Sequence, residues 1–176
     1  SDKTLVKIIN TKTLQTVMII EGKITAFDIS PDSKYVLSKT KEGVCQLWDI
    51  ATGRDIDLWR TEKSCTDIFF SNEGSFYVEV NDSWIGINGA LVVFELSTHR
   101  EFFQFNPMYV GISNAHYSED GSKLYCGSGG YIYILNSANG ELISKLPHND
   151  NTWFHGKLDC AVIYNPLYDK IFSSNR

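Results

Sequence analysis

The chain lacks a long apolar run, a cluster of basic residues and a paired set of cysteines, each of which would have narrowed its function. No apolar stretch approaches the roughly 18 to 20 residues that a membrane-spanning helix needs, so no membrane insertion is expected. Sixteen basic residues stand against 21 acidic ones and are scattered, which gives a net charge of −5. Binding to phosphate backbones requires a basic surface, so direct nucleic-acid binding is not expected either.

The four cysteines are also uninformative as a set. Cys45, Cys65, Cys126 and Cys160 are separated by 20, 61 and 34 residues, which fits neither paired metal ligands nor a small disulfide framework. Each lies in or beside an apolar segment, so we expect buried thiols in a reducing compartment. This favours an intracellular, cytoplasmic protein without a cofactor, and an exported or periplasmic one is the alternative.

The chain does contain a strand–turn–strand sequence motif that recurs four times. Each copy is an apolar run, then an acidic or amide residue, then a small polar turn. The anchors are Asn10, Asp49, Glu95 and Asn136, at intervals of 39, 46 and 41 residues. This period is that of four-stranded propeller blades, so we predict an all-β protein, a β-propeller of four-stranded antiparallel blades.

Turn residues divide the chain into three whole blades between two half-blades. The predicted blades are residues 23–62, 63–107 and 108–147, and the predicted halves are residues 1–22 and 158–176. The first half has the strands c and d of a blade, Leu5–Ile9 and Leu14–Ile20, and the last has strands a and b, Asp159–Tyr164 and Lys170–Ser174. Joined, the halves would close a four-bladed ring. The interpretation we favour is a fragment that forms about half of a larger ring, and the start at Ser1 is consistent with it.

The first blade resembles a WD40 repeat. The resemblance rests on Ile29–Tyr35 followed by Cys45–Arg54, which contains the name-giving pair Trp48-Asp49. In the later blades the corresponding residues are Phe94-Glu95 and Leu135-Asn136, which differ from the name-giving pair. The Gly-His dipeptide that often opens such repeats is absent. The resemblance implies a noncatalytic scaffold that binds other proteins within a multi-subunit complex.

Two shorter segments carry other resemblances. Ala161–Phe172 looks like the repeats of bacterial surface or periplasmic propellers, which would make the chain an exported ligand binder, metal binder or enzyme. Ile85–Leu96 resembles the WD40 subunit called i of eukaryotic translation initiation factor 3. That narrower resemblance implies a subunit of the translation initiation machinery.

Loop lengths indicate where a partner would bind. The b–c and d–a connections of a blade emerge on one face of the ring, and this face carries the two longest loops, Asn81–Ala90 and Pro147–Lys157. Each loop contains a tryptophan, a common anchor of protein interfaces. The predicted partner-binding residues are Trp84, Ile85, Trp153, Phe154 and His155. The alternative is that both indole rings fold back and cover the blades, as Trp48 and Trp59 are expected to do on their strands.

No catalytic arrangement stands out. His148, Asp150 and His155 could form a two-histidine, one-carboxylate metal site, but ordinary surface residues are the simpler interpretation. Ser128 in Gly127–Gly130 lacks the strand-to-helix turn of a nucleophile, and we expect a b–c hairpin there. Asp28, Asp67 and Asp159 are expected to accept hydrogen bonds from backbone groups. The sequence therefore predicts neither a catalytic nor a metal site.

Overall fold

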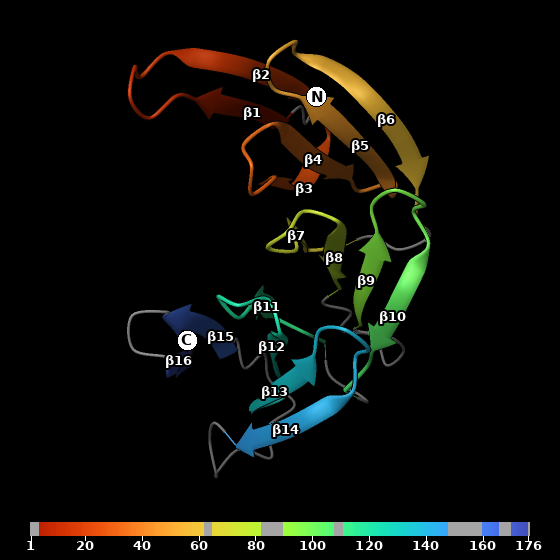
Figure 1. The fold of residues 1–176 in the computed structure, drawn as a ribbon, viewed down its shortest axis with the longest axis vertical. Helices are drawn as coiled ribbons and strands as arrows, with labels where there is room; N and C mark the ends of the chain where they lie inside the picture. The colour runs from red at the N-terminus through yellow and green to blue at the C-terminus, as the bar shows by residue number, and fades with distance from the viewer. Residues whose placement is uncertain are drawn as a thin grey trace. The chain divides into compact units, whose positions relative to one another are not determined.

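The computed structural model describes residues 4–61, 65–81, 90–107, 111–147, 160–165 and 170–175, the last two ranges as backbone only. Across these residues the regular structure consists of antiparallel β-strands, numbered β1 to β16 (Figure 1). They form three four-stranded and two two-stranded sheets. The chain divides into two compact units, Ser1–Phe70 and Ser71–Arg176, which are described separately.

The first unit contains a hairpin, one complete sheet and a further strand. The hairpin is β1 with β2, and the sheet has the order β3-β4-β5-β6. The bounds are β1 (Thr4–Ile9), β2 (Thr16–Gly22), β3 (Ile24–Ile29), β4 (Tyr35–Thr40), β5 (Val44–Asp49), β6 (Arg54–Arg60) and β7 (Asp67–Phe70).

The second unit continues the same pattern. Its strands take part in the sheet order β10-β9-β8-β7, in the complete sheet β11-β12-β13-β14 and in the hairpin β15-β16. The bounds are β8 (Phe76–Val80), β9 (Leu91–Glu95), β10 (Glu101–Phe105), β11 (Asn114–Tyr117), β12 (Lys123–Ser128), β13 (Tyr131–Asn136), β14 (Leu142–Pro147), β15 (Cys160–Asn165) and β16 (Lys170–Asn175). The prediction of an all-β fold built from four-stranded antiparallel blades is confirmed.

The c–d turns explain why the anchor residues recur. In each turn the carbonyl oxygen of the anchor accepts a hydrogen bond from the amide four residues later, at N···O distances of 2.8 to 2.9 Å. The donors are Leu14, Gly53, His99 and Gly140, and all four have positive φ, between 56° and 75°. Leu14 therefore belongs to the turn. The predicted strand Leu14–Ile20 was wrong at its start, since β2 begins at Thr16.

The inner strands are also shorter than predicted at their starts. The sequence pattern of the second and third blades predicts inner strands over Cys65–Phe70 and Gly111–Tyr117, whereas β7 begins at Asp67 and β11 at Asn114. In the second case Ser113 still donates its amide to the carbonyl of Gly127, at 3.0 Å. The extended backbone thus continues beyond the regular pairing. The Gly129-Gly130 hairpin lies between β12 and β13 as predicted.

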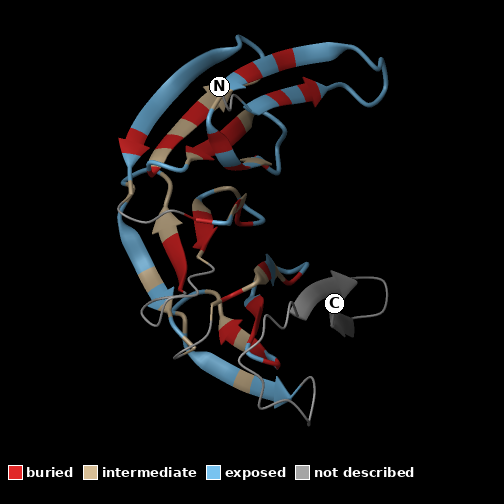
Figure 2. Ribbon diagram, turned by 180° about the vertical axis from the view of Figure 1, so that it is seen from behind, coloured by how far each residue is buried: buried red, intermediate tan, exposed pale blue. Residues whose placement is uncertain are grey.

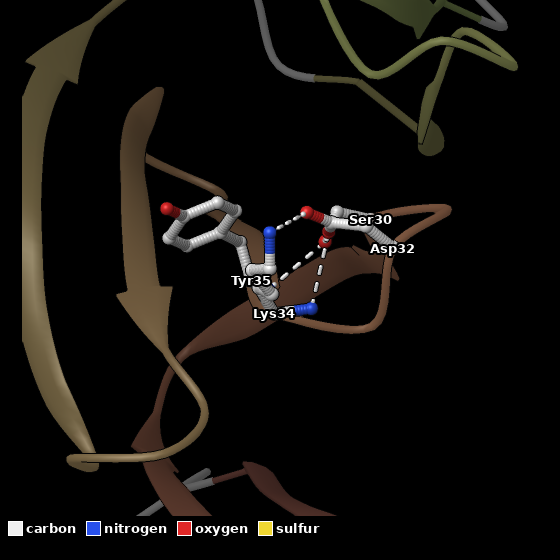
Figure 3. A network of polar contacts seen from close by, with 4 residues as sticks. All are labelled: Ser30, Asp32, Lys34 and Tyr35. Atoms are coloured by element: carbon white, nitrogen blue, oxygen red, sulfur yellow. Dashed lines mark hydrogen bonds and ion pairs between the residues drawn. The ribbon is translucent and has the colours of Figure 1, made fainter.

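The a–b turns are closed by a repeated serine. In the first complete sheet, Ser30 Oγ accepts a hydrogen bond from the Tyr35 amide at 2.9 Å and donates one to Asp32 Oδ1 at 2.7 Å (Figure 3). Asp32 also accepts from the Lys34 amide at 3.2 Å. Ser118 and Asp120 repeat the arrangement in the third sheet. The turns are thereby held in one shape, which sets the register of the two strands that each turn joins.

The core of the first unit lies between the β1–β2 hairpin and the sheet β3–β6. Inward-facing hairpin residues alternate with exposed ones, as Figure 2 shows along β1 and β2. The buried cluster is Val6, Ile8, Met18, Ile20, Ile24 and Val36, with Trp48 and Ile50 packed against it. Trp48 Nε1 donates to Ser38 Oγ at 2.9 Å. Both Trp48 and Trp59 lie on strands, and Trp59 is buried, so both have the structural role that the sequence predicted.

Candidate functional site

The first long loop, Asn81–Ala90, is joined at its two ends by a backbone hydrogen bond. The amide of Asn81 donates to the carbonyl of Ala90 at 2.9 Å, which continues the pairing of β8 with β9. Val80, Ala90 and Leu91 are fully buried around this point. The strands therefore fix where the loop leaves the sheet.

The same end of the other complete sheets is held by polar contacts. At the end of β4, the buried Lys39 donates from Nζ to Thr61 Oγ1 at 2.5 Å. At the end of β12, the buried Ser128 donates to the carbonyl of Gly111 at 3.0 Å. Each contact joins a b strand to the segment that connects two blades. Hydrogen bonds therefore hold together the ends of the strands from which the b–c and d–a connections emerge.

The predicted partner-binding residues Trp84, Ile85, Trp153, Phe154 and His155 lie outside the described residues, as do His148, Asp150 and Asp159. Their role stays a prediction. Within the described ranges, no group of three or more His, Cys, Asp or Glu side chains is arranged to hold a metal ion.

Two of the three inner-strand aspartates, Asp28 and Asp67, accept hydrogen bonds from the backbone, as the sequence predicted. Asp28 accepts hydrogen bonds from the amides of Ile29 and Phe70, at 2.8 and 2.9 Å, so it joins β3 to β7. Burial raises the pKa of the Asp28 carboxyl more strongly than these hydrogen bonds lower it. Asp67 accepts from the amide of Ile68 at 2.9 Å.

Three of the predicted buried thiols are seen directly, since Cys45, Cys65 and Cys126 are all buried cysteines outside any disulfide. Burial raises the pKa of the Cys126 thiol to about 12. Cys126 is fully buried and is therefore a core residue, as expected of a buried thiol.

A second surface, which the sequence did not predict, is the open face of the β1–β2 hairpin. This face, opposite the buried cluster, exposes large apolar side chains, which we call the hairpin face: Leu5, Ile9, Val17 and Ile19. Leu14 is also exposed, by 79%, in the turn between the strands. The signal was present in the sequence, since both strands are apolar almost throughout, which is typical of a strand buried on both faces.

The four-stranded antiparallel sheets recur along the chain with the same strand order and the same turns. This repetition defines the fold as a partial β-propeller. A solved chain of hydrazine synthase from Kuenenia stuttgartiensis has the same fold: it superposes with a TM-score of 0.72 at 16% identity, over 92% of this chain and 47% of that one. This likeness shows the fold alone.

The relatives in sequence include proteins named as subunits of eukaryotic translation initiation factor 3 and one named as an RNA-associated protein. The chain is 25% identical over 138 residues to eukaryotic translation initiation factor 3 subunit I of Scheffersomyces stipitis, covering 72% of this chain and 39% of the relative. Subunit I of Neurospora crassa is 29% identical over 76 residues, 43% of this chain and 22% of the relative. The U3 small nucleolar RNA-associated protein 21 homolog of Schizosaccharomyces pombe is 26% identical over 86 residues, 47% of this chain and 10% of the relative.

These similarities are partial. The chain spans about two fifths or less of the length of these relatives. No model of a protein family matches it. In the part of the chain that the structure describes, no helix is long and apolar enough to cross a membrane.

Proposed function

We propose that the chain is a WD40-like, noncatalytic scaffold that binds other proteins within an intracellular multiprotein assembly. The observation that carries this proposal is the similarity to translation initiation factor 3 subunit I over 72% of the chain, on a propeller fold. The relative from Schizosaccharomyces pombe is named for its association with the U3 small nucleolar RNA. Propellers carry many unrelated activities, so the fold by itself does not identify the function.

The proposed partner-binding face is the one that bears the b–c and d–a connections, with Trp84, Ile85, Trp153, Phe154 and His155. The hydrogen bond between Asn81 and Ala90 supports this choice, because it fixes where the loop leaves the sheet. With a net charge of −5, the chain is proposed to contact other proteins and not nucleic acid directly.

A narrower form of the proposal is that the assembly is the translation initiation machinery. It is supported by the names of the relatives from Scheffersomyces stipitis and Neurospora crassa. The resemblance of Ile85–Leu96 to subunit i also supports it.

The double variant Trp84→Ala/Trp153→Ala tests the binding face. We expect it to capture less of the initiation-factor subunits from cell extract than the unchanged protein does, while its circular dichroism and melting temperature stay the same. The matched control is Ile56→Ala/Leu58→Ala, which also removes two exposed large side chains, but from the outer strand β6. Equal capture by the two double variants would refute the proposed face.

A further inference from the structure

The start of β13 carries two tyrosines on one side of the strand. Tyr131 and Tyr133 are two residues apart, so both side chains point to the same face of the sheet β11–β14. This face contacts the preceding blade, since the ring centroids of Tyr133 and of Phe105 in β10 are 5.2 Å apart. Tyr133 is buried, whereas Tyr131 is 38% exposed. Both of these blades have all four strands, so no missing strand accounts for the exposure of Tyr131.

A lysine from the neighbouring strand lies over these rings. Lys145 is opposite Tyr133 in the pairing of β13 with β14, so its side chain points to the same face. Its Nζ atom lies 3.8 Å from the centroid of the Tyr131 ring and 5.3 Å from that of the Tyr133 ring. These are distances at which the face of an aromatic ring attracts a cation. The three residues form what we call the tyrosine–lysine cluster: Tyr131, Tyr133 and Lys145.

The ammonium group of Lys145 is held in place without being neutralised. The side chain is exposed, and among the described residues its Nζ atom forms neither an ion pair nor a hydrogen bond. The tyrosine rings attract the cation but carry no net charge, so the ammonium can still pair with a carboxylate. Contact with the rings also restricts the long side chain, which lowers the entropy that it would lose when a partner binds.

The other four-stranded sheets lack this cluster. The anchors of the c–d turns and the strand register identify the corresponding positions, and none of them holds an aromatic or charged residue. They are Val44, Gln46 and Leu58 in the sheet β3–β6, and Ala90, Val92 and Gln104 in the sheet β10-β9-β8-β7. Those sheets have the same strand order, so the fold does not require two tyrosines and a lysine here.

The cluster also adjoins the proposed partner-binding face. Tyr131 lies opposite Pro147, the first residue of the second long loop. Phe105, which contacts Tyr133, lies opposite Leu91, and Leu91 directly follows the first long loop. The cluster is therefore next to an end of each long loop.

We propose that the tyrosine–lysine cluster binds an acidic segment of a protein partner. Lys145 pairs with an aspartate or glutamate carboxylate, and the exposed area of Tyr131 packs against an apolar side chain beside it. The ammonium of Lys145 sets the charge of the bound group, because it already lies over the rings and would repel a second cation. Tyrosine is also among the residues enriched at the centres of protein interfaces. This inference rests on the proposed scaffold function and names the chemistry of the partner.

Charge reversal at Lys145 tests the inference. Tagged Lys145→Glu, Lys145→Arg and unchanged chains are compared for the initiation-factor subunits that they capture from cell extract, and circular dichroism checks that each is folded. The matched control is Lys123→Glu, which reverses an exposed charge at the opposite end of the same sheet. We expect Lys145→Glu to lower capture roughly tenfold, since it removes both an ion pair and a cation–π contact. Lys145→Arg and Lys123→Glu should stay within about twofold of the unchanged chain.

A cross-link without a spacer identifies the contact itself. A carbodiimide joins an amine to a carboxylate only where the two groups touch. Treatment of the captured complex should therefore give an amide between Lys145 and an aspartate or glutamate of a captured subunit, which mass spectrometry detects. Tyr131→Leu should lower the yield of this cross-link although Lys145 is still present.

The outcomes separate this inference from the function on which it rests. Equal capture by Lys145→Glu and Lys123→Glu would overturn the inference and leave the scaffold function standing, and so would a captured complex with cross-links at Lys123 and none at Lys145. Loss of the Lys145-dependent capture on nuclease treatment would assign the cluster to a nucleic-acid phosphate and would also overturn it. Failure of the unchanged chain to capture any initiation-factor subunit would overturn both the inference and the translation-initiation form of the proposed function.

Discussion

Gly140 is a turn position where an added side chain would collide with a neighbouring residue. It has φ of +75°, and its amide donates to the carbonyl of Asn136 at 2.8 Å. A Cβ atom on Gly140 would lie 2.7 Å from Cγ of Phe103 and closer still to Cδ2. Gly140→Ala therefore combines backbone strain with a collision against an aromatic ring.

The two costs can be separated with Gly130, in the same unit. Gly130 has φ of +78°, but a Cβ atom there would meet nothing within 4 Å. The left-handed conformation destabilises the folded state of an alanine variant by about 1–2 kcal/mol. The lower conformational entropy of its unfolded chain offsets about 0.4–1 kcal/mol of this. Overpacking against Phe103 adds about 1–3 kcal/mol. We expect Gly130→Ala to lower the free energy of unfolding by about 1 kcal/mol and Gly140→Ala by about 2–4 kcal/mol.

Urea unfolding followed by tryptophan fluorescence and circular dichroism measures both variants. The matching thermal shifts are about 2–4 °C per kcal/mol for a chain of this length. Adding Phe103→Ala to each glycine variant completes the test, since removal of the ring should relieve only the Gly140→Ala variant. Equal destabilisation by the two glycine variants would refute the collision with Phe103.

Three further predictions concern hydrogen bonds and strain. Because hydrogen bonds from Ser118 and Ser122 lower the pKa of Asp120 to about 2, its contribution to stability should be present above about pH 4 and lost as the pH falls toward 2; Asp120→Asn should remove this part of the pH dependence in urea titrations, and an unchanged profile would contradict it. Leu14→Gly should raise the free energy of unfolding by about 0.5–1 kcal/mol, because it relieves a positive φ on an exposed leucine; a lower melting temperature would count against this. Asp28→Ala should cost about 1–3 kcal/mol by leaving the buried Phe70 amide without its acceptor, and amide exchange at Phe70 should accelerate; unchanged exchange would be the contrary result.

Much of the fold could be predicted from the sequence because its signals are local. The alternation in Ile24–Ile29 and the serine and aspartate of the following turn each act within a few residues, and they form the strand and turn that they indicate. The anchor residues could be found for the same reason, since their hydrogen bonds reach only four residues along the chain.

The error at the start of β2 arose because one local signal outweighs another. Leu14 is apolar and lies just before the apolar run of β2, but the hydrogen bond from its amide to the carbonyl of Asn10 places it in a turn with positive φ. The exposure of the hairpin face could not be predicted, because apolar residues on both sides of a strand indicate burial of both faces, whereas Leu5, Ile9, Val17 and Ile19 are exposed.

The proposal of a scaffold is tested most directly by cross-linked affinity capture of the tagged protein from its own cells, followed by quantitative mass spectrometry. We predict a stable set of protein partners in fixed stoichiometry, with subunits of the translation initiation machinery among them. Recovery of the protein alone, or with copies of itself and nothing else, would contradict the proposed scaffold function.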